Sequence, residues 1–340
     1  MRKLLFAVWL TATKLCAQNA ALRATEEANL GVQAAQQSHF SEAIQHYKRA
    51  AAMDATLPGI YLDLGLAYFK SGQFREALTA FQREQARAPS DRVQILIAMS
   101  YFGLGNYKQA AAQLQSQADA QPSNPEMLYL LAKCYLWSGQ HEKAKSIFKD
   151  LLAQDPNSAA VHMLLGEAYD ADDRTFEAIA EFRSAIEKNP NQPQAHFGLG
   201  YLYWKQKQYP EAENEFRQEL AQTPDEPKAL AFLADILLKD GHKEEAQADL
   251  QRALRSDPKL ATAHVDLGTL YAEQKNTSAA IEQFRLAIRY DPKRYNAHYR
   301  LARLYREAGR TQEANAEFAI VAKLHADKDE GPLMEISGPQ

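Results

Sequence analysis

The chain has 340 residues, with 39 lysines and arginines against 43 aspartates and glutamates, so its formal net charge is −4. Hydrophobic residues make up 46 % and charged residues 24 %, values that are ordinary for a soluble protein. Because no basic domain or basic helix face stands out, nucleic acid is not an expected partner. No apolar run after the N-terminus approaches the ~20 residues of a membrane-spanning helix, so no transmembrane segment is expected in the mature chain.

The N-terminal residues 1–17 have the pattern of a secretory signal peptide. Basic Arg2 and Lys3 precede an apolar run at residues 4–10, and cleavage is expected after Ala17. We therefore expect export to a periplasmic or extracellular location. Two alternatives stay open: an extra helix packed on the first repeat, and a lipid anchor on Cys16.

A single alanine marks a repeat over most of the remaining chain. Its successive positions are 34 residues apart, with one interval of 33. A fixed period of this length is typical of stacked helix pairs. The alanine stands at Ala43, Ala77, Ala110, Ala144, Ala178, Ala212, Ala246, Ala280 and Ala314.

Each repeat contains two short helical patterns, seen most clearly in residues 261–296. Apolar residues recur at three- and four-residue steps over residues 263–274 and again over 278–290, the spacing that one buried helix stripe produces. A polar turn separates the two patterns, and Asp291-Pro292 ends the second. A helix pair this small buries its apolar stripe only by stacking on neighbouring pairs.

Small and bulky residues occupy matching positions in the two helices, which predicts close helix packing. The small residue of the first helix is Gly31, Gly65, Ala98, Ala132, Gly166, Gly200, Ala234, Gly268 or Ala302. The bulky residue of the second helix is Tyr47, Phe81, Leu114, Phe148, Phe182, Phe216, Leu250, Phe284 or Phe318.

At these residues the chain resembles the tetratricopeptide repeat family. The resemblance implies an all-α fold, a right-handed α-solenoid of about nine tandem helix-turn-helix repeats. A polar lead-in at 18–23 would precede the repeats and a polar tail at 327–340 would follow them. The expected repeats are 24–57, 58–90, 91–124, 125–158, 159–192, 193–226, 227–260, 261–294 and 295–326.

No group of residues predicts catalysis, a cofactor or a metal site. Four histidines share the fourth position of their repeats, at His162, His196, His264 and His298. Helices pack ~8–10 Å apart, whereas zinc–nitrogen bonds are only ~2.0–2.1 Å, so one ion cannot join two repeats. These histidines are interpreted as packing residues between repeats, and Cys134 as a buried, inert thiol. The protein is not expected to be an enzyme.

The resemblance also implies where a partner would bind. In this family the first helix of each repeat lines a concave groove, through its second, fifth, ninth, twelfth and thirteenth positions. The alternative is that these side chains only pack between adjacent first helices. The candidate groove residues are Leu62, Leu66, Phe69, Ile95, Met99, Phe102, Tyr129, Lys133, Leu136, Trp137, Phe197, Tyr201, Trp204, Arg303 and Arg306.

A contiguous apolar surface with aromatic anchors is typical of a protein-binding site. We therefore expect a non-catalytic scaffold that binds a peptide segment or helix of another protein. One alternative is a structural or assembly component of a cell-envelope secretion, pilus or polysaccharide-export complex. Another is a glycan- or lipid-binding accessory protein. Self-association through the terminal repeats is a further alternative for the partner.

Overall fold

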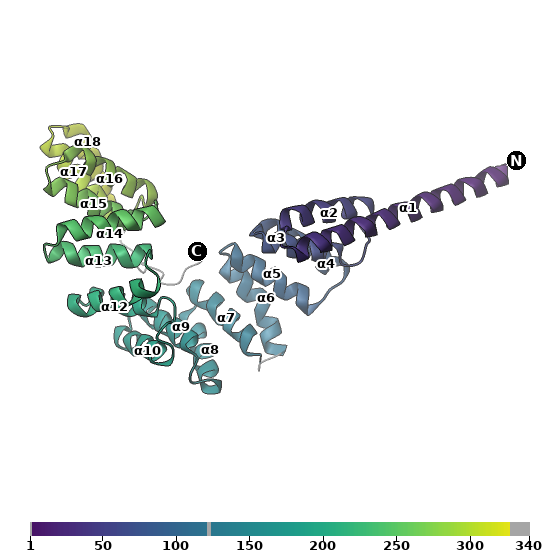
Figure 1. Ribbon diagram of the computed structural model, residues 1–340, viewed down its shortest axis with the longest axis horizontal. Coiled ribbons are helices and arrows are strands. Elements are labelled where there is room, and N and C mark those ends of the chain that lie inside the picture. Colours follow the sequence, from purple (N-terminus) through teal and green to yellow (C-terminus); the bar gives the residue numbers. More distant parts are fainter. Residues whose placement is uncertain (1, 121–123, 327–340) are drawn as a thin grey trace. The chain divides into compact units, whose positions relative to one another are not determined.

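The computed structural model describes residues 2–120 and 124–326, and the side chains of residues 19–119 and 124–325. Within these backbone ranges the regular elements are eighteen α-helices, without a strand (Figure 1). The predicted all-helical solenoid is confirmed. The predicted tail at 327–340 lies outside the described residues.

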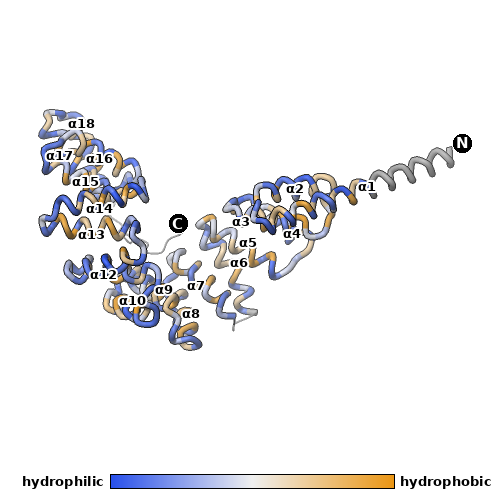
Figure 2. Tube along the Cα trace, in the orientation of Figure 1, coloured by the Kyte–Doolittle hydropathy of each residue, from blue (hydrophilic) through white to orange (hydrophobic). Residues whose placement is uncertain are grey.

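The helices follow one another with short connections, as a repeat of helix pairs requires. Figure 2 shows that hydrophobic and hydrophilic residues alternate in short stretches along them. Their bounds are α1 Arg2–Gln36, α2 Phe40–Met53, α3 Ile60–Lys70, α4 Phe74–Arg87, α5 Asp91–Gly103, α6 Tyr107–Ala120, α7 Pro125–Trp137, α8 His141–Gln154, α9 Ala159–Ala171, α10 Thr175–Lys188, α11 Ala195–Lys205, α12 Tyr209–Gln222, α13 Pro227–Lys239, α14 Lys243–Ser256, α15 Ala261–Glu273, α16 Thr277–Tyr290, α17 Tyr295–Glu307 and α18 Thr311–Ala326.

The helices form two compact units. The N-terminal unit holds α1 to α7 and most of α8, and the C-terminal unit holds α9 to α18. In the C-terminal unit each odd-numbered helix contacts the next odd-numbered helix as well as its even-numbered neighbours. The side chains of α11, α13, α15 and α17 therefore meet on one surface, which is where a groove was expected.

The predicted packing of small on bulky residues is confirmed. The recurring alanine is at most 1 % exposed in every repeat. A Cβ atom added to Gly65 would lie 2.5 Å from Cε1 of Phe81, and one added to Gly268 would lie 2.9 Å from Cε1 of Phe284. The glycines thus let the aromatic ring of the second helix rest directly on the backbone of the first.

Tyrosines hold successive repeats together. Tyr203 on α11 accepts a hydrogen bond through its hydroxyl from Nη2 of Arg183 on α10, at 2.6 Å. Tyr305 on α17 accepts one from Nε of Arg285 on α16, at 2.9 Å. In both cases a first helix is tied to the second helix of the preceding repeat, so the polar end of a largely buried ring is satisfied.

The turn within each helix pair contains one residue with a left-handed backbone. In several repeats this residue is glycine. In two others it is lysine, with φ angles of 62° at Lys207 and 60° at Lys275. Left-handed backbone strains residues that carry a Cβ atom. The full set is Ser38, Gly72, Gly105, Gly139, Asp173, Lys207, Gly241, Lys275 and Gly309.

The N-terminal segment is helical throughout α1, from Arg2 to Gln36. The side chains of residues 1–18 lie outside the described ones, and the signal peptide stays a prediction. Among the described residues, no helix combines the length and apolarity that a membrane crossing would need.

Candidate functional site

The candidate groove residues of the N-terminal unit lie on three successive first helices. All are partly buried except Leu136, which is 5 % exposed and belongs to the core. The three helices thus present largely apolar side chains at these positions. On α3 the residues are Leu62, Leu66 and Phe69; on α5 they are Ile95, Met99 and Phe102; on α7 they are Tyr129, Lys133, Leu136 and Trp137.

Aromatic side chains at the end of this set pack tightly around one cation. The Trp137 ring centroid lies 5.2 Å from that of Phe102 and 5.4 Å from that of Tyr107. Nζ of Lys133 stands 4.8 Å from the Trp137 centroid and 5.5 Å from that of Tyr129. These rings are in contact with one another and with a cation of the same chain, so this surface is filled from within.

In the C-terminal unit the candidate residues have four different environments. Phe197 is 1 % exposed and packs against the rings of Phe216 and Phe232, with both centroid distances 5.9 Å. It therefore belongs to the core. Arg303 pairs with a glutamate on its own helix, Glu307, at 3.6 Å. Tyr201 and Trp204 line a pocket.

The second arginine, Arg306, is exposed and does not line this pocket. Its guanidinium stands 5.4 Å from the centroid of the Phe318 ring.

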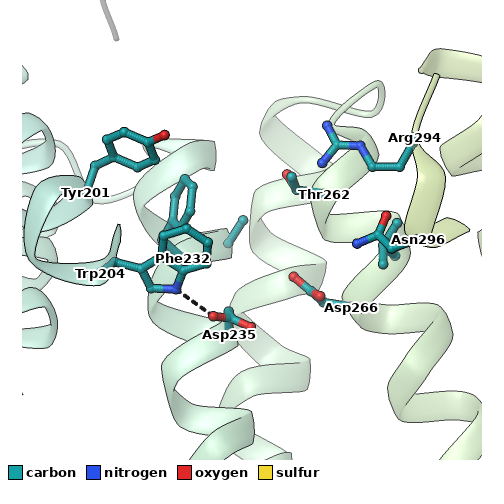
Figure 3. A pocket seen from close by; sticks show the side chains of 10 residues that line it. Tyr201, Trp204, Phe232, Asp235, Thr262, Asp266, Arg294 and Asn296 are labelled. Carbon is teal, nitrogen blue, oxygen red and sulfur yellow. Dashed lines mark hydrogen bonds between the residues drawn. The ribbon is translucent and has the colours of Figure 1, made fainter. Parts of the chain in front are cut away.

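The pocket opens between α11, α13 and α15, with the start of α17 at one side (Figure 3). Its volume is about 180 Å³. One wall is aromatic, and the facing wall carries polar side chains. The lining residues are Tyr201, Trp204, Ala231, Phe232, Asp235, Thr262, Val265, Asp266, Arg294 and Asn296.

The aromatic wall is held in place by ring contacts and one strong hydrogen bond. The Trp204 ring stands nearly edge-on to Phe232, with centroids 4.9 Å apart, and stacks on Tyr201 at 6.2 Å. Its indole Nε1 donates a hydrogen bond to Oδ2 of Asp235 at 2.6 Å, drawn in Figure 3. Lys239 pairs with the same carboxylate. The Trp204 ring is therefore oriented before any ligand arrives.

The facing wall contains polar groups without partners. Asp266 forms no hydrogen bond or ion pair with the described residues, and the hydroxyl of Thr262 is buried without a hydrogen-bond partner among them. Burial raises the pKa of Asp266 to about 7, and the negative charge of Asp235 adds to this effect. Lys239, Arg300 and Arg294 offset it only in part.

Most of the pocket was missed by the sequence analysis, although part of the signal was present. The groove positions taken from the family, applied to the seventh to ninth repeats, select Asp235, Thr262 and Asn296, together with two apolar lining residues. Phe232 and Asp266 stand at the sixth position, which that rule does not include. Only the spacing of neighbouring helices shows that this position also faces the pocket.

The histidines at the fourth position form hydrogen bonds within and between repeats. Nδ1 of His264 lies 2.7 Å from Oε1 of Gln283 on the second helix, and Nε2 lies 3.0 Å from the carbonyl oxygen of Pro258 in the preceding repeat. His298 repeats this arrangement with Glu317 and Pro292. Both ring nitrogens of these histidines are used in helix packing.

Cys134 is fully buried, as predicted. Burial raises the pKa of its thiol to about 12, so the thiol stays protonated at neutral pH. A protonated thiol is a poor nucleophile and a poor metal ligand, which agrees with the interpretation of Cys134 as inert.

A second hollow, of about 390 Å³, lies among α2, α3 and α4 of the N-terminal unit. Its two tyrosine rings already face cations of the chain: Arg83 lies 5.6 Å from the Tyr61 centroid, and Lys48 lies 5.5 Å from the Tyr68 centroid. The pocket beside Trp204 is therefore the better candidate for a ligand.

Comparison with family models gives consistent matches along the chain. A model described as tetratricopeptide repeat matches residues 101–168, 171–236 and 271–330, more than half of the chain. A second model with the same description matches residues 233–293. A model of the anaphase-promoting complex, cyclosome, subunit 3, matches residues 36–117. A search of curated proteins found no match.

Several solved structures have a similar fold. The APC/C hetero-tetramer Cut9–Hcn1 matches with a TM-score of 0.61 and 14 % identity, over 90 % of this chain and 74 % of that one. Pseudomonas aeruginosa pilF gives 0.54 and 18 %, over 60 % and 93 %. The human IFIT1 dimer with m7Gppp-AAAA gives 0.53 and 21 %, over 78 % and 68 %. At these identities the likeness concerns the fold alone.

Proposed function

Because the chain belongs to the tetratricopeptide repeat family, whose repeats support a role as a protein-interaction scaffold, we propose that it binds a peptide segment or helix of another protein. The binding surface is formed by the first helices of the C-terminal unit. The observation that carries this proposal is the pocket beside Trp204, where an oriented aromatic wall faces polar groups without partners.

Three features of this pocket and its surroundings support binding of a peptide side chain rather than of a drug-sized ligand. Pockets for drug-sized ligands usually measure ~300–1,000 Å³, whereas this one is about 180 Å³ and suits a single side chain. Oriented tryptophans and tyrosines are frequent anchors of protein interfaces. The odd-numbered helices also continue past the pocket on both sides, so an extended segment would find further contacts.

The test is selection of random peptides on a phage-displayed library, with the full chain as bait. Selected peptides are then titrated against the full chain and against Trp204→Ala, with Trp137→Ala as the matched control from the other unit. We expect Trp204→Ala to weaken binding by about 30-fold, since anchor residues contribute ~2 kcal/mol or more. Peptides that bind Trp204→Ala as tightly as the parent chain would contradict the proposal.

We further propose that the protein acts outside the cytoplasm. The support is the N-terminal sequence alone, in which Arg2 and Lys3 precede the apolar run and Ala17 ends the expected signal. Mass spectrometry of the mature N-terminus tests this. A chain that begins at Gln18 is the expected result, and a chain that retains residues 1–17 would contradict it.

A further inference from the structure

The pocket beside Trp204 combines properties that limit which type of side chain it can bind. Its aromatic wall comes from α11 and α13, through Tyr201, Trp204 and Phe232. On the facing wall, from α15, Figure 3 shows the carboxylate of Asp266 directed into the space between the walls. An apolar, π-rich surface thus stands opposite a negatively charged group.

The other charged groups of the pocket already have partners. Asp235 accepts from Trp204 Nε1 and pairs with Lys239. Nε of Arg294 donates to Oδ2 of Asp291 at 2.8 Å. Asp266, in contrast, forms no hydrogen bond or ion pair within the described chain, and Lys239, Arg300 and Arg294 act on it only from beyond ion-pair distance.

Asp266 is partly buried, and a carboxylate in such a position without a hydrogen bond or ion pair is stabilised when it is protonated or meets a cation. An apolar side chain in the pocket would disfavour the ionised carboxylate further, because it would remove the remaining water from Asp266. An acidic side chain would be repelled by both Asp266 and Asp235. A basic side chain would be stabilised twice, by the carboxylate and by the faces of the aromatic rings.

We propose that this pocket receives the side chain of a lysine or arginine from the bound segment. The aliphatic part of that side chain packs against Trp204 and Phe232, and its charged end reaches Asp266, with Thr262 as an additional acceptor. This inference rests on the proposed function, since it names the residue type by which the peptide is recognised.

The raised pKa of Asp266 has a consequence for binding. A cation prefers the ionised carboxylate, so binding of a basic side chain would release the proton that Asp266 holds at low pH. The charged groups around it are Asp235 and Lys239 on α13, Arg294 before α17 and Arg300 on α17. Affinity is therefore expected to rise as the pH increases from 5 to 8, through the Asp266 pKa of about 7.

The experiment extends the peptide selection with a double-mutant cycle. One selected peptide is synthesised in its original form and with norleucine in place of its lysine or arginine, and both are titrated at pH 8 against the full chain and Asp266→Asn. We expect norleucine to weaken binding to the parent chain by about tenfold or more. Against Asp266→Asn the two peptides should bind within about twofold of each other.

Asp240→Asn is the matched control, because Asp240 is exposed at the end of α13 and does not line the pocket. It should keep the full preference for the basic peptide. The Asp266→Asn variant is expected to fold, since it keeps the shape of a partly buried side chain and removes a charge that the folded chain disfavours. Its circular dichroism and urea midpoint are measured beside the binding.

The outcomes separate this inference from the function on which it rests. Selected peptides that depend on Trp204 but lack a common basic residue would overturn the inference and leave peptide binding standing. The same holds if norleucine costs as much affinity in Asp266→Asn as in the parent chain. A library that yields no peptide dependent on Trp204 would overturn both.

Discussion

The two units use the same positions of their first helices for different purposes. In the N-terminal unit, Phe102, Tyr129 and Trp137 surround Lys133, so the aromatic faces are occupied by a cation of the same chain. In the C-terminal unit, Trp204 stands beside an open pocket, and the nearby Asp266 forms no ion pair within the described chain. The N-terminal unit thus places one of its own cations against its aromatic rings, whereas the aromatic wall of the C-terminal pocket faces open space.

The two tryptophans show the difference in detail. The indole nitrogen of Trp137 is buried without a hydrogen-bond partner among the described residues, whereas that of Trp204 donates to Asp235. A tryptophan packed on Phe102 and Tyr107 contributes mainly to stability. A tryptophan oriented by a carboxylate at the edge of a pocket is prepared for binding.

Substitution of the two tryptophans has the largest expected effect and tests whether the two units differ in function. Trp137→Ala should lower the free energy of unfolding by about 3 kcal/mol, because it leaves a cavity among packed rings. It should leave peptide affinity within about twofold, while Trp204→Ala loses affinity as described above. Urea unfolding followed by circular dichroism measures the first effect, and fluorescence titration the second. Equal losses of affinity in both variants would mean that both units bind.

Glycine packing gives a second, smaller contrast between the units. Gly65→Ala should lower the free energy of unfolding by about 1–3 kcal/mol, since its Cβ would press on Phe81 at 2.5 Å. Gly268→Ala should cost less, because the corresponding distance to Phe284 is 2.9 Å and the gain in helix propensity offsets part of the strain. Urea midpoints of the two variants compare them directly. A larger loss at Gly268 would contradict this ranking.

The pocket acid predicts a pH dependence of the stability of the C-terminal unit. The pKa of Asp266 is raised above the usual carboxyl value, so the folded chain holds this proton more tightly than the unfolded chain does. Stability linked to Asp266 is full below pH ~4 and is lost as the pH rises through about 7. Asp266→Asn should therefore stabilise the protein more at pH 8 than at pH 5. Equal stabilisation at both pH values would show that the carboxyl ionises normally.

The turns between paired helices give a further comparison, in which substitutions should change the free energy of unfolding by about 1 kcal/mol. The left-handed turn position is glycine at Gly105 in the N-terminal unit but lysine at Lys275 in the C-terminal unit. Lys275→Gly should raise the free energy of unfolding by about 1 kcal/mol by relieving backbone strain. Gly105→Lys is the reverse variant and should lower it by a similar amount. Thermal and urea unfolding measure both, and a destabilised Lys275→Gly would disprove the strain argument.

The smallest effect concerns His196, whose pKa is raised chiefly by its hydrogen bond with Glu215. The stability that this proton adds is present in full below pH ~6.5 and is lost as the pH rises through the raised value. His196→Gln should therefore cost about 1 kcal/mol or less at pH 5.5 and still less at pH 8.5. His39→Gln, at an exposed position, is the control. The free energy of unfolding is measured at both pH values. A larger loss of stability from His196→Gln at pH 8.5 than at pH 5.5 would contradict this prediction.

The repeat made the fold predictable from the sequence alone. Helix pairs, the buried alanine and the contact between small and bulky residues depend on local periodicity and on residue size, both of which can be read along the chain. Ala280 and Phe284 illustrate this, since their spacing alone predicts that they share one helix face, and both are buried. Trp204, predicted at a groove position, lies on α11 and lines the pocket, and its role in binding stays a prediction.

What the sequence did not reveal was which of these surfaces is filled and which is open. Lys133 stands against the faces of its aromatic neighbours, whereas Asp266 forms no ion pair within the described chain. Both facts depend on distances between side chains, many of them on different helices. Those distances depend on how neighbouring helices are spaced and rotated, and the 34-residue pattern is nearly the same for both units. Periodicity therefore determined the scaffold, whereas the tertiary structure decided which aromatic rings already face a cation of the chain and which line an open pocket.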